Sequence, residues 1–243
     1  MIKDKKEPYM KLTESKILIT GGSLGIGKAM AKLFVEEGAK VIITGRDKNR
    51  LNSAAKETGA IPKIFDVSDF DQIVPKTCEI IEELGGIDIL INNAGIGEFD
   101  LLDDITLESF QRIFNINVFG LALLTKEVSK RFKKQNRGQI INLGSTAASK
   151  GFEYGTVYAA SKFALRGMTQ CWQAELRKFN VRVTLLNPSE VTTAFSDNAT
   201  RMERENESKK LAPQDIAFMA KTIIEMENKG FIPEITAWAT NPW

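Results

Sequence analysis

The chain has 243 residues, 43% of them apolar, a mass of 27.0 kDa and a formal net charge of +2. A nearly balanced charge offers no broad basic face for nucleic acid or an anionic membrane. No apolar run approaches the roughly 20 residues of a transmembrane helix. No secretory signal opens the chain, so we expect a cytoplasmic protein. The sequence contains no histidine, which excludes Ser-His-Asp and Cys-His nucleophile systems within it.

The two cysteines, Cys78 and Cys171, lack the spacing of a metal site or a disulfide framework. We expect both to be small core residues on helices, and we expect no metal site. Any chemistry must then use tyrosine, lysine, serine or carboxylate side chains, or a bound cofactor.

Short apolar runs alternate along the chain with longer segments of helical period. Strands are expected at Lys16–Thr20, Val41–Thr44, Ile61–Asp66, Ile87–Asn92, Ile140–Leu143, Val181–Leu186 and Ile235–Trp238. Helices are expected from Ile26 to near Gly38, through Leu51 to Gly59, over Ile73–Leu84 with a bend at Pro75, over about Leu107–Lys133, and from Tyr158 onward. This alternation predicts an α/β fold, a single doubly wound domain with a seven-stranded parallel sheet and helices on both faces.

One domain is expected over residues 15–243, preceded by a flexible tail over residues 1–14. Met10 could serve as a natural start, which leaves open whether residues 1–9 belong to the native chain. The polar stretch Ser196–Lys210 is predicted to be a loop or short helices that could act as a lid. The basic cluster near Lys133 is interpreted as a solvated helix end that complements the helix dipole.

The first expected strand leads directly into Thr20–Gly27, with the sequence TGGSLGIG, and then into a helix. Glycines permit a tight turn and a close approach of the backbone to a pyrophosphate. The first amides of the following helix can then bind the phosphates. The candidate dinucleotide contacts in this turn are Gly21, Ser23, Leu24, Gly25, Ile26 and Gly27.

Further motifs follow in a fixed order along the chain. Asn92–Gly95 (NNAG) follows the fourth strand, Asn117 lies in an N-V-x-G stretch, Ser145 follows the fifth strand, and Tyr158–Lys162 (YAASK) opens a helix. With the T-G-x-x-x-G-x-G turn, this order resembles the short-chain dehydrogenase/reductase family, notably 3-oxoacyl-carrier-protein reductases and related carbonyl reductases. The resemblance extends from Lys16 to the C-terminus.

The resemblance implies a role for each matching residue. It gives four catalytic residues: Asn117, Ser145, Tyr158 and Lys162. It implies cofactor contacts at Asp66 and Val67 with adenine, at Asn93, Ala94 and Gly95 near the riboses, at Tyr158 and Lys162, and at Pro188, Val191 and Thr193 with the carboxamide. Ser189 stands where the family has a glycine, which is a departure from the pattern.

Tyr158 and Lys162 are four residues apart, so on a helix they share one face. Reduction of a carbonyl by hydride forms an alkoxide, which needs a nearby proton donor. We expect the Lys162 ammonium to lower the pKa of Tyr158 from its ordinary value of about 10. Ser145 can donate a hydrogen bond to the carbonyl oxygen. By resemblance, the backbone carbonyl of Asn117 holds a water that leads toward Lys162, which also binds the nicotinamide ribose.

The second strand ends Thr44-Gly45-Arg46, where many dinucleotide-binding proteins have a carboxylate for the ribose hydroxyls. Gly45 removes that carboxylate, and the guanidinium of Arg46 can bind a 2′-phosphate, with Lys48 adding positive charge. We therefore predict NADP(H) as the cofactor. The alternative is that Arg46 only begins a solvated helix that Asp47 caps.

The leading hypothesis is an NADPH-dependent reductase of a ketone, aldehyde or 3-oxoacyl small-molecule substrate. Two alternatives stay open: an NADP-dependent alcohol dehydrogenase working in the oxidative direction, and a non-catalytic NADP(H)-binding redox sensor. Residues expected to flank the substrate cleft are Ile96, Phe152, Tyr154 and Phe195. Because tryptophans near a terminus favour burial, we predict a homodimer or homotetramer with Trp238 near a subunit interface. No nucleic-acid or membrane partner is expected.

Overall fold

Seven short apolar segments form the strands of one sheet in the computed structural model, which describes residues 9–193, 195 and 207–242. The strands are β1 (Lys16–Ile19), β2 (Lys40–Gly45), β3 (Ile61–Ile64), β4 (Ile89–Asn92), β5 (Gly138–Leu143), β6 (Val181–Pro188) and β7 (Glu234–Ala237). All neighbouring strands pair in parallel in the order β3-β2-β1-β4-β5-β6-β7. The predicted doubly wound parallel sheet is therefore confirmed.

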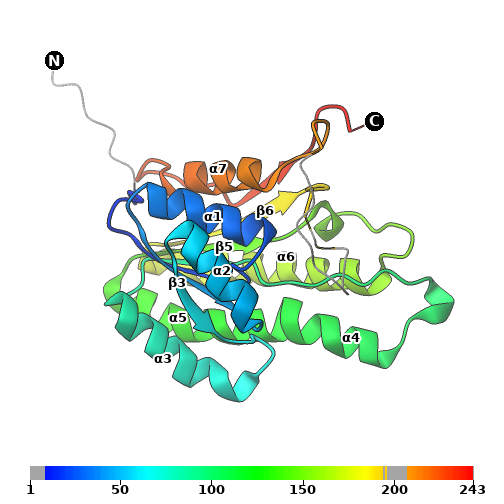
Figure 1. The fold of residues 1–243 in the computed structure, drawn as a ribbon, viewed down its shortest axis with the longest axis horizontal. Helices are drawn as coiled ribbons and strands as arrows, with labels where there is room; N and C mark the ends of the chain where they lie inside the picture. The colour runs from blue at the N-terminus through cyan, green and yellow to red at the C-terminus, as the bar shows by residue number, and fades with distance from the viewer. Residues whose placement is uncertain (1–8, 194, 196–206, 243) are drawn as a thin grey trace.

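Helices cover both faces of this sheet (Figure 1). They are α1 (Gly25–Glu36), α2 (Lys48–Thr58), α3 (Ile73–Leu84), α4 (Leu107–Phe114), α5 (Leu121–Gln135), α6 (Thr156–Leu176) and α7 (Pro213–Ile224). Short helical turns connect them at η1 (Phe70–Gln72), η2 (Leu102–Asp104), η3 (Asn115–Gly120), η4 (Thr146–Ala148) and η5 (Arg177–Phe179). α1, α2 and α7 pack on one face, and α3, α4, α5 and α6 pack on the other.

The strands are apolar on both faces because each face is covered. In β1, Ile17 and Ile19 join the core beneath α1 and α7, while Leu18 joins the core on the opposite side. This is the alternation expected of a strand whose successive side chains point to opposite faces.

Two helix predictions need correction. The helix expected over about Leu107–Lys133 consists of α4, a π-helical turn at η3, and α5. α3 begins at Ile73, so Pro75 lies in its first turn and not at a bend within it. The first amides of a helix have no intrahelical partner, so a proline there removes no hydrogen bond.

The cysteine prediction is wrong, since both thiols are exposed. Cys78 is on α3, whose buried face carries Ile73, Thr77, Ile80 and Leu84. Cys171 lies in the same way on the solvent side of α6. The two residues occupy the helices we expected but face outward.

The prediction of a flexible tail over residues 1–14 is also wrong for residues 9–14, the part that the structure describes. Met10 and Leu12 are buried in the core cluster beneath α1 and α7, and the amide of Tyr9 donates to the carbonyl of Met226 at 3.1 Å. Of the stretch predicted to be a loop or lid, residues 196–206 lie outside the described residues. Among the helices that the structure describes, none combines the length and apolar character needed to cross a membrane.

Candidate active site and dinucleotide cleft

The turn between β1 and α1 is built from glycines that leave no room for side chains. Gly21 and Gly25 have φ values of +66° and +53°, a backbone conformation that favours glycine. A Cβ at Gly21 would lie 2.8 Å from the Cα of Ala94, and one at Gly27 would lie 2.4 Å from Nδ2 of Asn93. The turn therefore closes tightly against the segment that follows β4.

Hydrogen bonds join this turn to the NNAG segment. The Oγ1 of Thr20 accepts from the amides of Asn93 and Ala94 at 3.1 and 3.0 Å. The side-chain amide of Asn93 donates to the carbonyls of Thr20 and Gly21, at 2.9 Å each. Leu24 precedes α1 without a side-chain cap, so the first amides of α1 are available to an anion.

Arg46, just after β2, and Arg50, in the first turn of α2, both line the same cleft. Asp47 accepts from the amide of Arg50 at 2.9 Å, so it caps α2 as predicted, and its carboxylate also pairs with Nη2 of Arg50 at 3.2 Å. The Nε of Arg50 and the Oγ1 of Thr44 are buried without a hydrogen-bond partner among the described residues. Arg46 is exposed and lines the cleft, whereas Lys48 does not.

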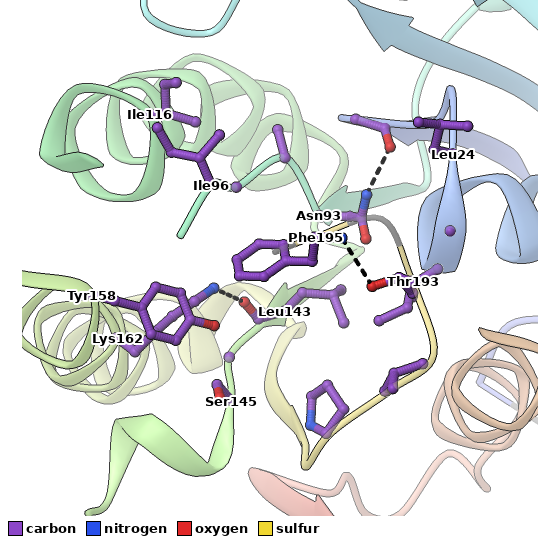
Figure 2. Close-up of a pocket in the computed structure, with 18 of the residues that line it drawn as sticks. Leu24, Asn93, Ile96, Ile116, Leu143, Ser145, Tyr158, Lys162, Thr193 and Phe195 are labelled. Atoms are coloured by element: carbon purple, nitrogen blue, oxygen red, sulfur yellow. Dashed lines mark hydrogen bonds between the residues drawn. The ribbon is translucent and has the colours of Figure 1, made fainter. Parts of the chain in front are cut away.

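Tyr158 and Lys162 lie on the buried face of α6, as their spacing predicts. The Nζ of Lys162 donates to the carbonyl of Leu143 at 2.8 Å and lies 5.7 Å from the centroid of the Tyr158 ring. Ser145, just after β5, lies near Tyr158 and acts to lower the pKa of its phenol. Figure 2 shows these three side chains grouped at one end of the cleft.

Burial moves the pKa values of both residues on α6. It raises the pKa of Tyr158 to about 12, against a smaller lowering by the neighbouring Ser145 hydroxyl. It lowers the pKa of Lys162 to about 8. The prediction that Lys162 lowers the pKa of Tyr158 is therefore wrong for the protein alone, because desolvation of the phenolate dominates.

Asn117 lies at the centre of the π-helical turn η3, so the locally disturbed helix implied by the resemblance is present. Its Nδ2 donates to the carbonyl of Ile96 at 2.9 Å and to Oγ of Ser161 at 3.1 Å, and its Oδ1 accepts from the amide of Ile96 at 3.0 Å. The side chain thus fixes the segment after Gly95 against α6. A Cβ at Gly95 would lie 3.4 Å from Oδ1 of Asn117 and 3.9 Å from Nζ of Lys162.

These elements enclose one continuous cavity of about 660 Å³. Nearly all predicted contacts line it: Gly21, Ser23, Leu24, Gly25, Ile26, Arg46, Asp66, Val67, Asn93, Ala94, Gly95, Ser145, Tyr158, Lys162, Pro188, Val191 and Thr193. Gly27 and Asn117 do not, because they pack behind the lining residues. Ile96, Phe152 and Phe195 line the expected substrate end, but Tyr154 is exposed and lies outside the lining.

In the loop after β6, Ser189 replaces the glycine of the family pattern without backbone strain. Ser189 is not among the residues with positive φ, and its amide donates to the carbonyl of Ala237 at 2.8 Å. Thr193 approaches the glycine turn, since a Cβ at Gly25 would lie 3.1 Å from its Cγ2. The loop therefore borders the cavity beside the glycine turn.

A short chain dehydrogenase family model matches residues 15–204. The chain belongs to the short-chain dehydrogenase/reductase family. The 3-oxoacyl-[acyl-carrier-protein] reductase of Thermotoga maritima is 36% identical over 201 residues, which cover 81% of this chain and 82% of that protein.

Solved structures agree with this membership. The 3-ketoacyl-(acyl-carrier-protein) reductase from Brucella melitensis, complexed with NADH, superposes with a TM-score of 0.85 at 28% identity, over 96% of this chain and 100% of that one. A metagenomic short-chain oxidoreductase in complex with NADP gives a TM-score of 0.79 at 27% identity, over 93% and 98% of the two chains. As a short-chain dehydrogenase/reductase, the chain is an oxidoreductase that acts on CH–OH or C=O groups.

Three residues of this short-chain dehydrogenase/reductase site were missed by sequence reasoning. Asn187 is buried at the end of β6, and its Oδ1 accepts from the amide of Ser145 at 3.1 Å. Arg50 and Phe99 both line the cavity. The position of Arg50 in the first turn of the helix that follows Arg46 was a signal that could have found it.

Proposed function

We propose that this short-chain dehydrogenase/reductase is an NADPH-dependent reductase, which converts a ketone, aldehyde or 3-oxoacyl group to the alcohol. The observation that carries the proposal is the arrangement within one cavity. Its lining has a buried tyrosine, a serine and a lysine at one end, and a glycine turn with two arginines at the other. A nicotinamide dinucleotide bound along this cavity supplies the hydride for the carbonyl carbon.

The residues present fit such a dinucleotide. Side chains at Gly21 or Gly25 would be strained and crowded, so these glycines leave backbone amides near a pyrophosphate. Asp66 and Val67 would border the adenine, and the loop carrying Pro188, Val191 and Thr193 the nicotinamide.

The preference for NADPH rests on the end of β2. Gly45 supplies no carboxylate to repel a 2′-phosphate, and the guanidinium groups of Arg46 and Arg50 can pair with one. The unpartnered Nε of Arg50 and Oγ1 of Thr44 are polar atoms that a bound ribose phosphate can satisfy.

Tyr158 acts as the proton donor in this proposal. With a pKa of about 12, its phenol is protonated at neutral pH and can transfer a proton to the oxygen of the substrate. Ser145 donates a hydrogen bond to the same oxygen as negative charge develops on it. Lys162 would contact the nicotinamide ribose, and the backbone carbonyl of Asn117, in η3, would bind a water on the path toward Lys162.

We also infer a homodimer or homotetramer with Trp238 at a subunit contact. The side chain of Trp238, on the surface just after β7, is 69% exposed in the single chain. Burying so large an aromatic side chain against a second copy removes apolar area from water.

The test is a panel of ketones, aldehydes, quinones and 3-oxoacyl thioesters, incubated with the purified protein and either NADPH or NADH. The proposal expects nucleotide oxidation with at least one carbonyl class, faster with NADPH at equal subsaturating concentrations. Tight binding of NADPH without turnover of any carbonyl would instead support a redox sensor.

A further inference from the structure

Three phenylalanines gather around the proposed proton donor. The ring centroids of Phe99 and Phe195 each lie 5.6 Å from that of Tyr158, both in edge-to-face orientation. Phe152 extends the group, with its centroid 5.9 Å from that of Phe99. We call Phe99, Phe152 and Phe195 the aromatic wall. Figure 2 shows Phe195 and Tyr158 together in the cavity, with Ser145 close by.

The rings of the aromatic wall pack against two glycines, Gly97 and Gly155. A Cβ at Gly97 would lie 2.6 Å from Cε1 of Phe195 and 2.8 Å from Cζ of Phe99. A Cβ at Gly155 would lie 2.6 Å from Cε1 of Phe152. Each ring therefore occupies space that any residue other than glycine would take from it.

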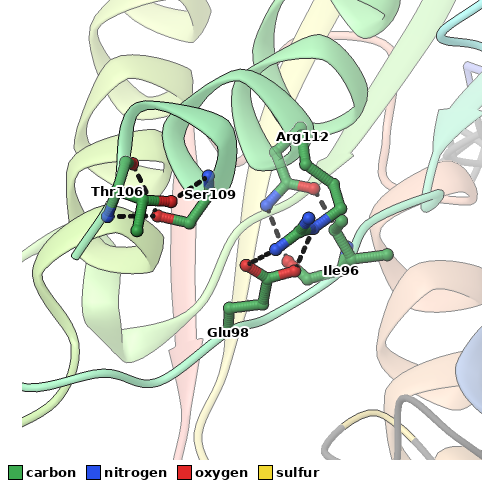
Figure 3. A network of polar contacts seen from close by, with 6 residues as sticks. Ile96, Glu98, Thr106, Ser109 and Arg112 are labelled. Atoms are coloured by element: carbon green, nitrogen blue, oxygen red, sulfur yellow. Dashed lines mark hydrogen bonds and ion pairs between the residues drawn. The ribbon is translucent and has the colours of Figure 1, made fainter. Parts of the chain in front are cut away.

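The loop that carries Phe99 is anchored on both sides of Gly97. Arg112 on α4 forms a two-pronged ion pair with Glu98 (Figure 3). The side chain of Asn117 donates to the carbonyl of Ile96 and accepts from its amide. These contacts hold the backbone next to Phe99, so its ring has a defined position at the cavity. A preformed apolar surface binds a ligand with less loss of conformational entropy.

The wall offers apolar area to a ligand, and the charges near it are already paired. Phe99 and Phe152 are 39% and 49% exposed although both line the cavity. The charged residues among the described lining at this end are Lys162, which donates to a backbone carbonyl, and Glu190, which pairs with Lys210 at 2.8 Å. No unpaired cation among the described lining residues here can receive a substrate carboxylate or phosphate.

We infer that the aromatic wall selects carbonyl compounds that carry an uncharged aromatic ring close to the C=O group. This inference rests on the proposed reductase function, because it assumes that the carbonyl lies at Tyr158 and Ser145. A substrate ring in edge-to-face or offset contact with one phenylalanine gains about 2- to 12-fold in affinity beyond apolar burial. An open alkyl chain of equal size gains the burial but not this contact.

The kinetic test compares two methyl ketones with the same number of carbon atoms, benzylacetone and methyl octyl ketone, with NADPH. Wild type is expected to show the higher kcat/KM for benzylacetone. Phe99→Leu and Phe152→Leu, which keep an apolar side chain, are each expected to lower the ratio of the two kcat/KM values by about 3- to 10-fold. Phe218→Leu is the matched control, since Phe218 is exposed on α7 and does not line the cavity. An unchanged ratio in both wall variants would overturn the inference.

A binding measurement separates failure of the inference from failure of the proposed function. Calorimetric titration in excess NADP⁺ compares benzamide with cyclohexanecarboxamide, neither of which is expected to be reduced. Where turnover is measurable, the ratio of the two kcat/KM values decides whether the aromatic wall selects aromatic substrates. Where it is not, the ratio of the affinities for benzamide and cyclohexanecarboxamide decides. If no carbonyl is reduced but benzamide binds better and loses this advantage in the wall variants, the reductase proposal fails and the aromatic wall stands. If carbonyls are reduced with no dependence on Phe99 or Phe152, the reductase proposal stands and the aromatic wall fails.

Discussion

Replacing Lys162 with methionine should stabilise the protein at neutral pH while damaging the proposed site. Lys162 is 6% exposed, and burial lowers its pKa from 10.5 to about 8. At about 1.36 kcal/mol per tenfold change, this shift means that keeping the ammonium inside the fold costs about 3 kcal/mol. Loss of the hydrogen bond to the Leu143 carbonyl offsets about 1–2 kcal/mol of that gain. Lys162→Met is therefore expected to be more stable than wild type by about 1–2 kcal/mol at about pH 7.

The stability difference between Lys162→Met and wild type should depend on pH. Below about pH 8 the lysine is protonated in both the folded and the unfolded state, so wild type bears the full cost of burial. As the pH rises from about 8 to 10.5, the folded state releases its proton first and the cost fades. The advantage of Lys162→Met should therefore shrink to zero within this range, and near its upper end wild type should be the more stable protein, because only the lost hydrogen bond to Leu143 then counts.

Denaturant unfolding followed by circular dichroism, at several pH values across this window, measures the effect. Lys56→Met is the control, because Lys56 is exposed on α2 and its replacement should give no such pH-dependent difference. A Lys162→Met protein that is less stable than wild type by the same amount at every pH would refute the reasoning.

Other predictions concern the cofactor, the glycine turn and assembly. Arg46→Ala should reduce the preference for NADPH over NADH by about 1.5–3 kcal/mol, and adding Gly45→Asp should reverse it; equal affinities of wild type for both nucleotides in calorimetry would contradict this. Gly21→Ala places a Cβ 2.8 Å from backbone at a φ of +66°, so NADPH affinity and Tm should both fall, whereas Gly151→Ala, with nothing within 4 Å, should leave both unchanged. Mass measurement in solution should give particles larger than 27.0 kDa and a shift toward monomer in Trp238→Ala; particles of 27.0 kDa alone in wild type would refute the proposed assembly.

The sequence predicts the fold well because its signals are local. Apolar runs of strand length alternate with helical periodicity, and glycines such as Gly59, at φ +76°, end helices where expected. The cleft follows from the same pattern, since the carboxyl ends of parallel strands share one edge of the sheet. The sequence thus predicts that Gly21, Tyr158 and Thr193 share one cavity, although they lie far apart in the chain.

The errors arise where the outcome depends on packing in three dimensions. Whether Cys78 faces inward depends on which side of α3 meets the sheet, and the burial of Met10 depends on contacts with α1 and α7. Burial raises the pKa of Tyr158 whereas the spacing from Lys162 predicted a lowering, and spacing alone does not measure burial. Asn187 binds the amide of Ser145 only because β5 and β6 are adjacent in the sheet, so no local sequence motif predicts this contact.

The central claim is that the phenol of Tyr158 delivers the proton during carbonyl reduction. The direct measurement is the turnover of Tyr158→Phe, with the exposed Tyr154→Phe as control, on the best carbonyl substrate with NADPH. Because general acid catalysis is worth about 10²- to 10⁴-fold, the rate of Tyr158→Phe should fall by that factor while NADPH affinity changes little. A folded Tyr158→Phe protein that binds NADPH and keeps turnover near that of wild type would contradict the mechanism.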